Sequence, residues 1–148
     1  MRNDSALFFT CSLIEYIGRQ QKQKRSMIVT CLGRDVVKRI YKYADVFHCE
    51  PIEKVADEFI ARCEIPTACF DNVAGCRYEV PDYWIIGEVY ERLIEDIVKE
   101  DVTDGIVDCI VAVYTSWIDD VISNYNSDFY YQSREYICEC YKEGRICA

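Results

Sequence analysis

Apolar residues recur at helical spacing along nearly the whole chain. The first segment carries four of them, Leu7, Cys11, Ile14 and Ile17. Residues three and four positions apart lie on one face of a helix, so this spacing predicts an amphipathic helix over about 4–21. Asp4 or Ser5 is suited to cap its first turn, because a short side-chain oxygen can accept a hydrogen bond from a free backbone N–H.

Three further helices are predicted before residue 64, over 26–33, 34–47 and 50–63. Gly33 separates the first two, because glycine accepts the left-handed conformation that commonly follows a helix end. Pro51 fits the first turn of the third, where a missing N–H costs nothing.

Residues 64–81 interrupt the pattern. Pro66, Gly75 and Pro81 punctuate this stretch, and no hydrophobic period holds across it. We therefore expect an irregular connector here rather than a helix.

The apolar period returns after Pro81. It predicts a fifth helix over 82–99, a sixth over 103–122 and a final short helix from Ser133 to Gly144. Thr103 is expected to cap the sixth helix, which carries two adjacent apolar rows. A helix that is apolar over so wide a face belongs in the centre of a fold.

These segments predict an all-α fold, a compact bundle of six to seven helices with an irregular loop near residues 64–81. We expect one helical domain over 1–148, although the loop could divide it into 1–63 and 82–148. Half of the residues are apolar, which argues against disorder. We find neither a signal peptide nor an apolar run long enough to span a membrane, and so expect a cytoplasmic protein.

The sequence contains no motif that would indicate an enzyme. His48 is the only histidine, and the glycines never cluster into a phosphate-binding loop. The chain is cysteine-rich, with ten cysteines, but Cys138 and Cys140 form the only close pair and would point apart on a helix. We therefore expect mostly free thiols, no metal, no cofactor and no catalysis.

Positive charge is concentrated in one segment of an acidic protein. Residues 19–42 carry eight basic residues and one acid, a net charge of +7 in a chain of −9. A face of one sign suggests an anionic partner. The candidate residues for such a face are Arg34, Lys38, Arg39, Lys42, Lys24 and Arg25.

Two alternatives to a protein partner remain open for the basic segment. A helix, a glycine and a second helix are compatible with a helix-turn-helix, which would make the protein a small nucleic-acid-binding regulator. The basic residues could equally pair with the protein's own acidic ridge, which runs from Glu88 to Asp108.

Twelve tyrosines give a second candidate surface. Tyrosine is favoured at the centres of protein interfaces. The candidate aromatic contact surface comprises Tyr125, Phe129, Tyr130, Tyr131 and Tyr136. The alternative is that this segment packs onto the sixth helix.

The N-terminal third resembles a known family. The elements that carry the resemblance are Leu7-Phe8-Phe9, Ile14-Glu15-Tyr16, the helix Val36–Tyr43 and its ending Asp45-Val46-Phe47-His48. They are similar to short uncharacterised bacterial helical proteins often encoded beside ADP-ribosyltransferase-like toxins. The resemblance implies an antitoxin or immunity role and provides no active site.

We therefore expect a non-enzymatic protein-interaction module that acts by occluding a partner protein, which the resemblance implies is a toxin. The alternative is the nucleic-acid-binding regulator described above.

Overall fold

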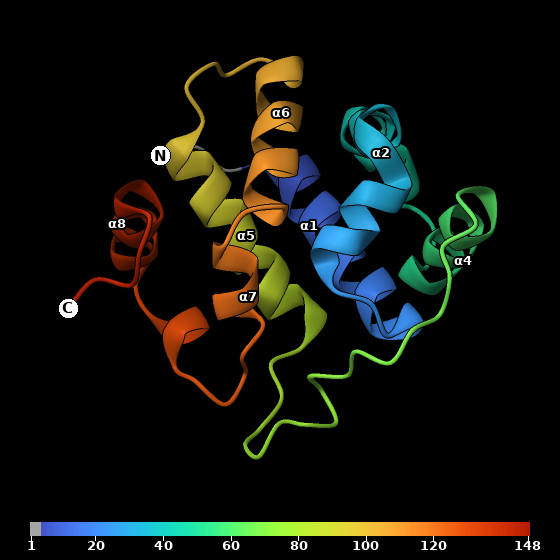
Figure 1. Cartoon of the computed structure of the whole chain (residues 1–148). Coiled ribbons are helices and arrows are strands. Elements are labelled where there is room, and N and C mark those ends of the chain that lie inside the picture. Colours follow the sequence, from blue (N-terminus) through green and yellow to red (C-terminus); the bar gives the residue numbers. More distant parts are fainter. Residues whose placement is uncertain (1–3) are drawn as a thin grey trace.

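A computed structural model describes residues 4–148, and within this range the fold is all-helical, as predicted (Figure 1). The elements in chain order are α1 Ser5–Gln21, α2 Arg25–Lys42, α3 Ala44–Phe47, α4 Ile52–Arg62, α5 Tyr83–Ile97, α6 Thr103–Tyr114, α7 Ile118–Ile122, the 3₁₀ helix η1 Phe129–Tyr131 and α8 Arg134–Glu143. None of the described helices is both long and apolar enough to cross a bilayer.

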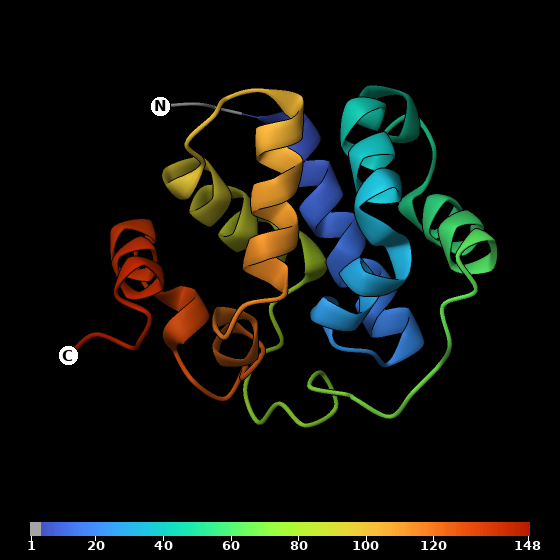
Figure 2. The same ribbon diagram turned by 45° about the horizontal axis from the view of Figure 1, so that its top comes forward.

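Helix α1 lies at the centre of the bundle, packed against α5, α2 and α4, and α6 packs mainly against α2 (Figures 1 and 2). The Asp4 carboxylate accepts a 3.0 Å hydrogen bond from the Leu7 N–H, which confirms the predicted cap. The helix ends at Lys22, whose φ of 53° is left-handed. Because α1 is surrounded, even Thr10, Ser12 and Glu15 are buried.

The predicted break at Gly33 is confirmed. Its φ of 79° and ψ of 159° are not helical, so the span α2 consists of two helices joined across a kink at this glycine. Glycine takes this conformation without a steric penalty, since it has no Cβ. A second break, which was not predicted, comes at Tyr43, after which α3 forms a separate short helix.

The predicted single helix over 103–122 is in fact two helices. Helix α6 ends at Tyr114 and α7 begins at Ile118. At the break, the Thr115 hydroxyl donates to Val111 O and the Ser116 hydroxyl donates to Val113 O, both at 2.7 Å. Such bonds from hydroxyl side chains to preceding carbonyls compete with the helical ladder, which explains why the apolar period alone did not reveal the break.

The ends of the C-terminal helices largely follow the prediction. Asp82 caps α5 and Ser133 caps α8, and Gly144 closes α8 with a φ of 74°. Thr103 is the first residue of α6 rather than its cap, a position that Val102 occupies.

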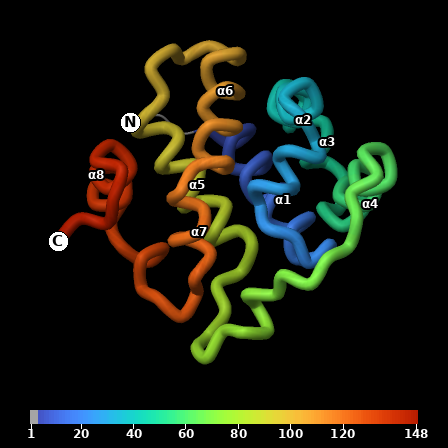
Figure 3. The backbone as a smooth tube through the Cα atoms, viewed as in Figure 1, coloured from blue at the N-terminus to red at the C-terminus, as the bar shows by residue number. Residues whose placement is uncertain are grey.

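Residues 64–81, which we call the strap, contain neither helix nor strand, as predicted. The strap runs from α4 to α5 across one end of the bundle (Figure 3). It is anchored to the α1–α2 turn, where the N–H groups of Ala68 and Phe70 donate to Gln21 O and Lys22 O, each at 2.9 Å. The strap is therefore fixed by backbone hydrogen bonds.

Candidate functional site

Much of the predicted basic face is neutralised within the protein. Arg34 Nε lies 2.6 Å from Asp108 Oδ1, and Lys38 Nζ lies 2.8 Å from Asp104 Oδ1. Both acids belong to α6, within the acidic ridge that runs from Glu88 to Asp108. These two cations therefore contact the protein's own acidic ridge.

The other predicted cations divide into three cases. Lys24 pairs with Asp120 at 3.3 Å on the surface. Arg25 is only 4% exposed and so is not on an outer face. Arg39 and Lys42 are exposed and make no ion pair with any described residue. Arg39 and Lys42 are thus the two candidate cations without an acid of the described residues beside them, whereas Lys24, Arg34 and Lys38 lie at the surface within ion pairs.

Arg25 lies at the centre of a buried polar cluster, which we call the Arg25 network. Its Nε donates to Asp119 Oδ1 at 2.8 Å, its Nη2 donates to Ser123 Oγ at 2.5 Å and its Nη1 donates to Tyr125 OH at 2.9 Å. Its Nη1 also donates to Glu15 Oε1. One guanidinium therefore joins α1, the start of α2, α7 and the segment after α7.

The hydroxyls of two tyrosines complete the Arg25 network. Tyr90 OH donates to Asp119, and Tyr125 OH donates to Glu15 Oε2 at 2.8 Å. Burial by itself would raise the pKa of Glu15, but Arg25 and Arg19 outweigh it and hold that pKa below its usual value. Both carboxylates therefore face a paired cation, and the arrangement joins α1, α2, α5 and α7.

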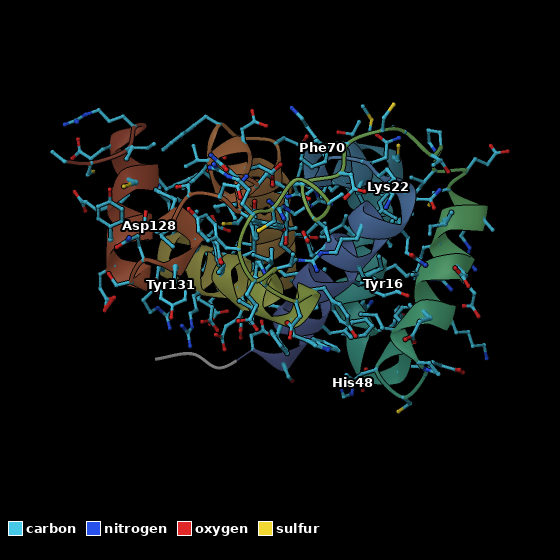
Figure 4. The ribbon with its side chains drawn as sticks, turned by 90° about the horizontal axis from the view of Figure 1, so that it is seen from below. Tyr16, Lys22, His48, Phe70, Asp128 and Tyr131 are labelled. Carbon is cyan, nitrogen blue, oxygen red and sulfur yellow. The ribbon has the colours of Figure 1, made fainter. Side chains whose placement is uncertain are left out.

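A cavity of about 240 Å³ lies beside the Arg25 network and under the strap. Its lining includes three cations, Arg19, Lys22 and Arg25. Arg19 pairs with Glu15, and Lys22 pairs with Asp71 of the strap at 3.1 Å, so every one of these cations already has an acid. Figure 4 shows Lys22 and Phe70 close together where the strap crosses this end.

The predicted aromatic surface is only partly exposed. Tyr125 and Phe129 are 3% and 4% exposed. Tyr136 is half-buried and donates its hydroxyl to Cys147 O at 2.6 Å. These three side chains pack inward, as the alternative reading of this segment allowed.

Tyr130 and Tyr131 remain at the surface, and Tyr131 is 81% exposed. The Tyr131 side chain borders two hollows. The first, of about 170 Å³, lies between α5 and α8 and has a mixed lining, whose apolar members include Ile85, Val89 and Ile137. The second, of about 510 Å³, is lined mainly by tyrosines.

We call this region the Tyr131 surface and define it by Ile85, Tyr78, Asp128, Tyr130 and Tyr131. Ile85 and Tyr78 are 49% and 65% exposed, so three large apolar side chains stand outward around the two hollows. Figure 4 shows Asp128 and Tyr131 on one side of the molecule and His48 far from both. Tyr131 was predicted as a contact residue, whereas Ile85 and Tyr78 were missed because they come from α5 and the strap.

The described residues contain no cluster of His, Cys, Asp and Glu arranged to hold a metal ion. None of the ten cysteines is paired in a disulfide. His48 is exposed and packs edge-on against Phe9, with ring centroids 5.9 Å apart, away from any thiol hydrogen bond that would mark a nucleophile pair.

Comparison with known proteins adds no further constraint: no family model, no curated protein and no solved structure matches the chain.

Proposed function

We propose that the protein is a non-enzymatic interaction module that binds a partner protein through the Tyr131 surface and occludes a site on that partner. The observation that supports this proposal is the 81% exposure of Tyr131 between two hollows. A side chain this exposed buries little apolar area when the chain folds. We expect it to bury that area when a partner binds.

The chemistry of the surface favours a protein partner. Tyrosine and isoleucine side chains supply apolar area, and Arg92 and Glu88 form a charged rim beside the first hollow, where they pair at 3.3 Å. An apolar centre with a polar rim is the usual composition of a protein interface.

The scaffold behind the surface supports binding without rearrangement. Tyr125 carries the Tyr131 segment and is fixed by Arg25 and Glu15. Asn126 joins the same segment to the strap through Arg77 N at 2.7 Å and Gly75 O at 3.0 Å. A surface fixed in advance loses less conformational entropy when it binds.

The identity of the partner follows from the resemblance of the N-terminal third. If the likeness to proteins encoded beside ADP-ribosyltransferase-like toxins extends to function, the partner is a toxin and the module acts as its antitoxin or immunity protein. Occlusion needs no catalytic group, in agreement with the absence of a catalytic motif in the sequence.

Site-specific crosslinking tests the proposal. A photoreactive amino acid is placed at Tyr131, and the matched control places it at Tyr43, a tyrosine 46% exposed at the far end of α2. In host cells, the probe at Tyr131 is expected to give one discrete adduct with another protein, and the probe at Tyr43 is not. Equal labelling at both positions, or none at Tyr131, would overturn the proposal.

The toxin assignment has a separate test. The gene next to the one encoding this chain is expressed alone and together with it. Growth arrest that the wild-type chain relieves and Tyr131→Asp does not relieve is the expected result. Relief that is independent of Tyr131 contradicts the proposed surface, and a harmless neighbour contradicts the toxin assignment.

A further inference from the structure

We infer that the second hollow of the Tyr131 surface receives a lysine or arginine side chain of the partner protein. This inference rests on the proposed function and specifies which part of the partner enters the surface. Three observations carry it: the arrangement of the tyrosine rings, the charge of the lining, and a cation that the chain itself places at one of these rings.

Two tyrosine rings meet edge to face at the border of the hollow. The Tyr130 ring is nearly perpendicular to that of Tyr131, at 88° and 6.2 Å between centroids. Tyr78 lines the same hollow from the strap. These exposed tyrosine rings supply π-faces at the hollow, and π-faces attract cations.

The only charged residue in the lining is an acid. Asp128 borders the hollow, and its carboxylate makes no ion pair or hydrogen bond with any described residue. The other polar lining residues, Asn126 and Ser127, are neutral. Aromatic faces and an unpaired carboxylate together complement a cation and disfavour an anion.

A cation already lies at one of these tyrosines. The Arg77 guanidinium carbon is 6.0 Å from the centroid of the Tyr78 ring. The first hollow differs, because its arginines are engaged with acids: Arg92 pairs with Glu88, and Arg134 pairs with Glu95 and Asp96. In the second hollow, by contrast, Asp128 has no cation of the described residues paired with it. A basic side chain of the partner can therefore pair with this carboxylate.

The size of the hollow suits a side chain rather than a folded element. A volume of about 510 Å³ is ample for a lysine or arginine side chain, and it opens to solvent beside the exposed Tyr131 ring. Lysine and arginine carry long apolar stems, which can lie against Tyr130 and Tyr131 while the charged group reaches Asp128.

An NMR titration with small probes tests this inference. The probes are N-acetyl-lysine methylamide and N-acetyl-arginine methylamide, and the matched neutral control is N-acetyl-norleucine methylamide. Saturable shifts at Tyr130, Tyr131 and Asn126 are expected with the two cations at millimolar concentrations and not with norleucine. Equal binding of norleucine, or no saturation with either cation, would overturn the inference.

Two variants locate the site. Tyr131→Ala removes a ring that is 81% exposed, so the fold remains intact while binding of the lysine probe weakens about two- to fivefold. Asp128→Asn removes the charge and keeps the shape, with a loss of similar size. Unchanged affinity in both variants places the probe elsewhere and refutes the inference.

The titration and the crosslink fail independently. A heterologous adduct at Tyr131 without binding of the cationic probes supports the proposed function and rejects the inference. Binding of the probes without an adduct rejects the proposed function and leaves a cation site. A crosslinked adduct of two copies of this chain would reject the proposal that the partner is a different protein.

Discussion

Gly87 of α5 lies directly against Ser12 of α1. A methyl group built at Gly87 would lie 2.2 Å from Ser12 Oγ and 2.9 Å from Ser12 Cα and N. A real Cβ does not approach other atoms this closely, so this position has room only for glycine. The two helices therefore meet almost backbone to backbone. The pairing of α1 with α5 is the most extensive helix–helix contact of the fold.

The first prediction follows from this contact. We expect Gly87→Ala to lower the free energy of unfolding by about 1–3 kcal/mol, because the backbone of α1 must move to admit the methyl group. Urea unfolding measures the change. Gly75→Ala is the matched control, since its nearest neighbouring atom would be 3.5 Å away. Equal urea midpoints of unfolding for the two variants would contradict the close contact between Gly87 and Ser12.

The second prediction concerns the Arg25 network. We expect Arg25→Met to cost about 3–5 kcal/mol of stability, because it leaves the buried acids Glu15 and Asp119 without their shared cation. Arg39→Ala, at an exposed position, is the control and should change stability by less than about 0.5 kcal/mol. Equal melting temperatures for Arg25→Met and wild type would show that the network contributes nothing.

The third prediction concerns pH. Burial, followed by the charges of Glu95, Glu88 and Asp4, raises the pKa of Glu91 from 4.5 to about 7. Between these values the folded protein keeps a proton that the unfolded chain has released, so stability should fall as pH rises from about 4.5 to 7. Glu15 acts in the opposite sense, but its pKa is lowered from 4.5, so it titrates in more acidic solution.

Glu91→Gln isolates this effect. The amide cannot ionise, so we expect the variant to match wild type near pH 4.5 and to melt at a higher temperature at pH 8. Thermal unfolding followed by circular dichroism at both pH values is the measurement. If the difference in melting temperature between the variant and wild type is the same at both pH values, Glu91 titrates normally.

The fourth prediction concerns nucleic acid. Of the eight basic residues in 19–42, six pair with acids of this chain, which leaves Arg39 and Lys42. We expect charge reversal of Arg39 and Lys42 to leave retention on heparin or DNA unchanged at low salt. A clear loss of retention would instead favour the helix-turn-helix alternative.

Local signals predicted most of the helices. Asp4, Asp82 and Ser133 mark helix starts and Gly144 marks an end, because capping depends on residues within one turn. The break between α6 and α7 was missed, since the apolar rows run straight through it and only the hydroxyls of Thr115 and Ser116 indicate it.

The candidate site was predictable only in part. Tyr131 was identified from the density of tyrosines, whereas Ile85 and Tyr78 reach the same surface through folding. Arg25 was placed on an exposed face because it lies among other cations, although its partners are far away along the chain. The one available signal was a pair of acids on otherwise apolar helix faces, Glu15 after Ile14 and Asp119 after Ile118.

The Arg25 network also sets an order for folding during synthesis. Arg25 lies 94 positions before Asp119 and 100 positions before Tyr125. Burying the charge of Arg25 is unfavourable until these partners have left the ribosome. The early helices are therefore expected to stay loosely packed until most of the chain has been synthesised. We expect truncation before Tyr125 to leave a chaperone substrate, because the last third of the protein completes the centre of the first.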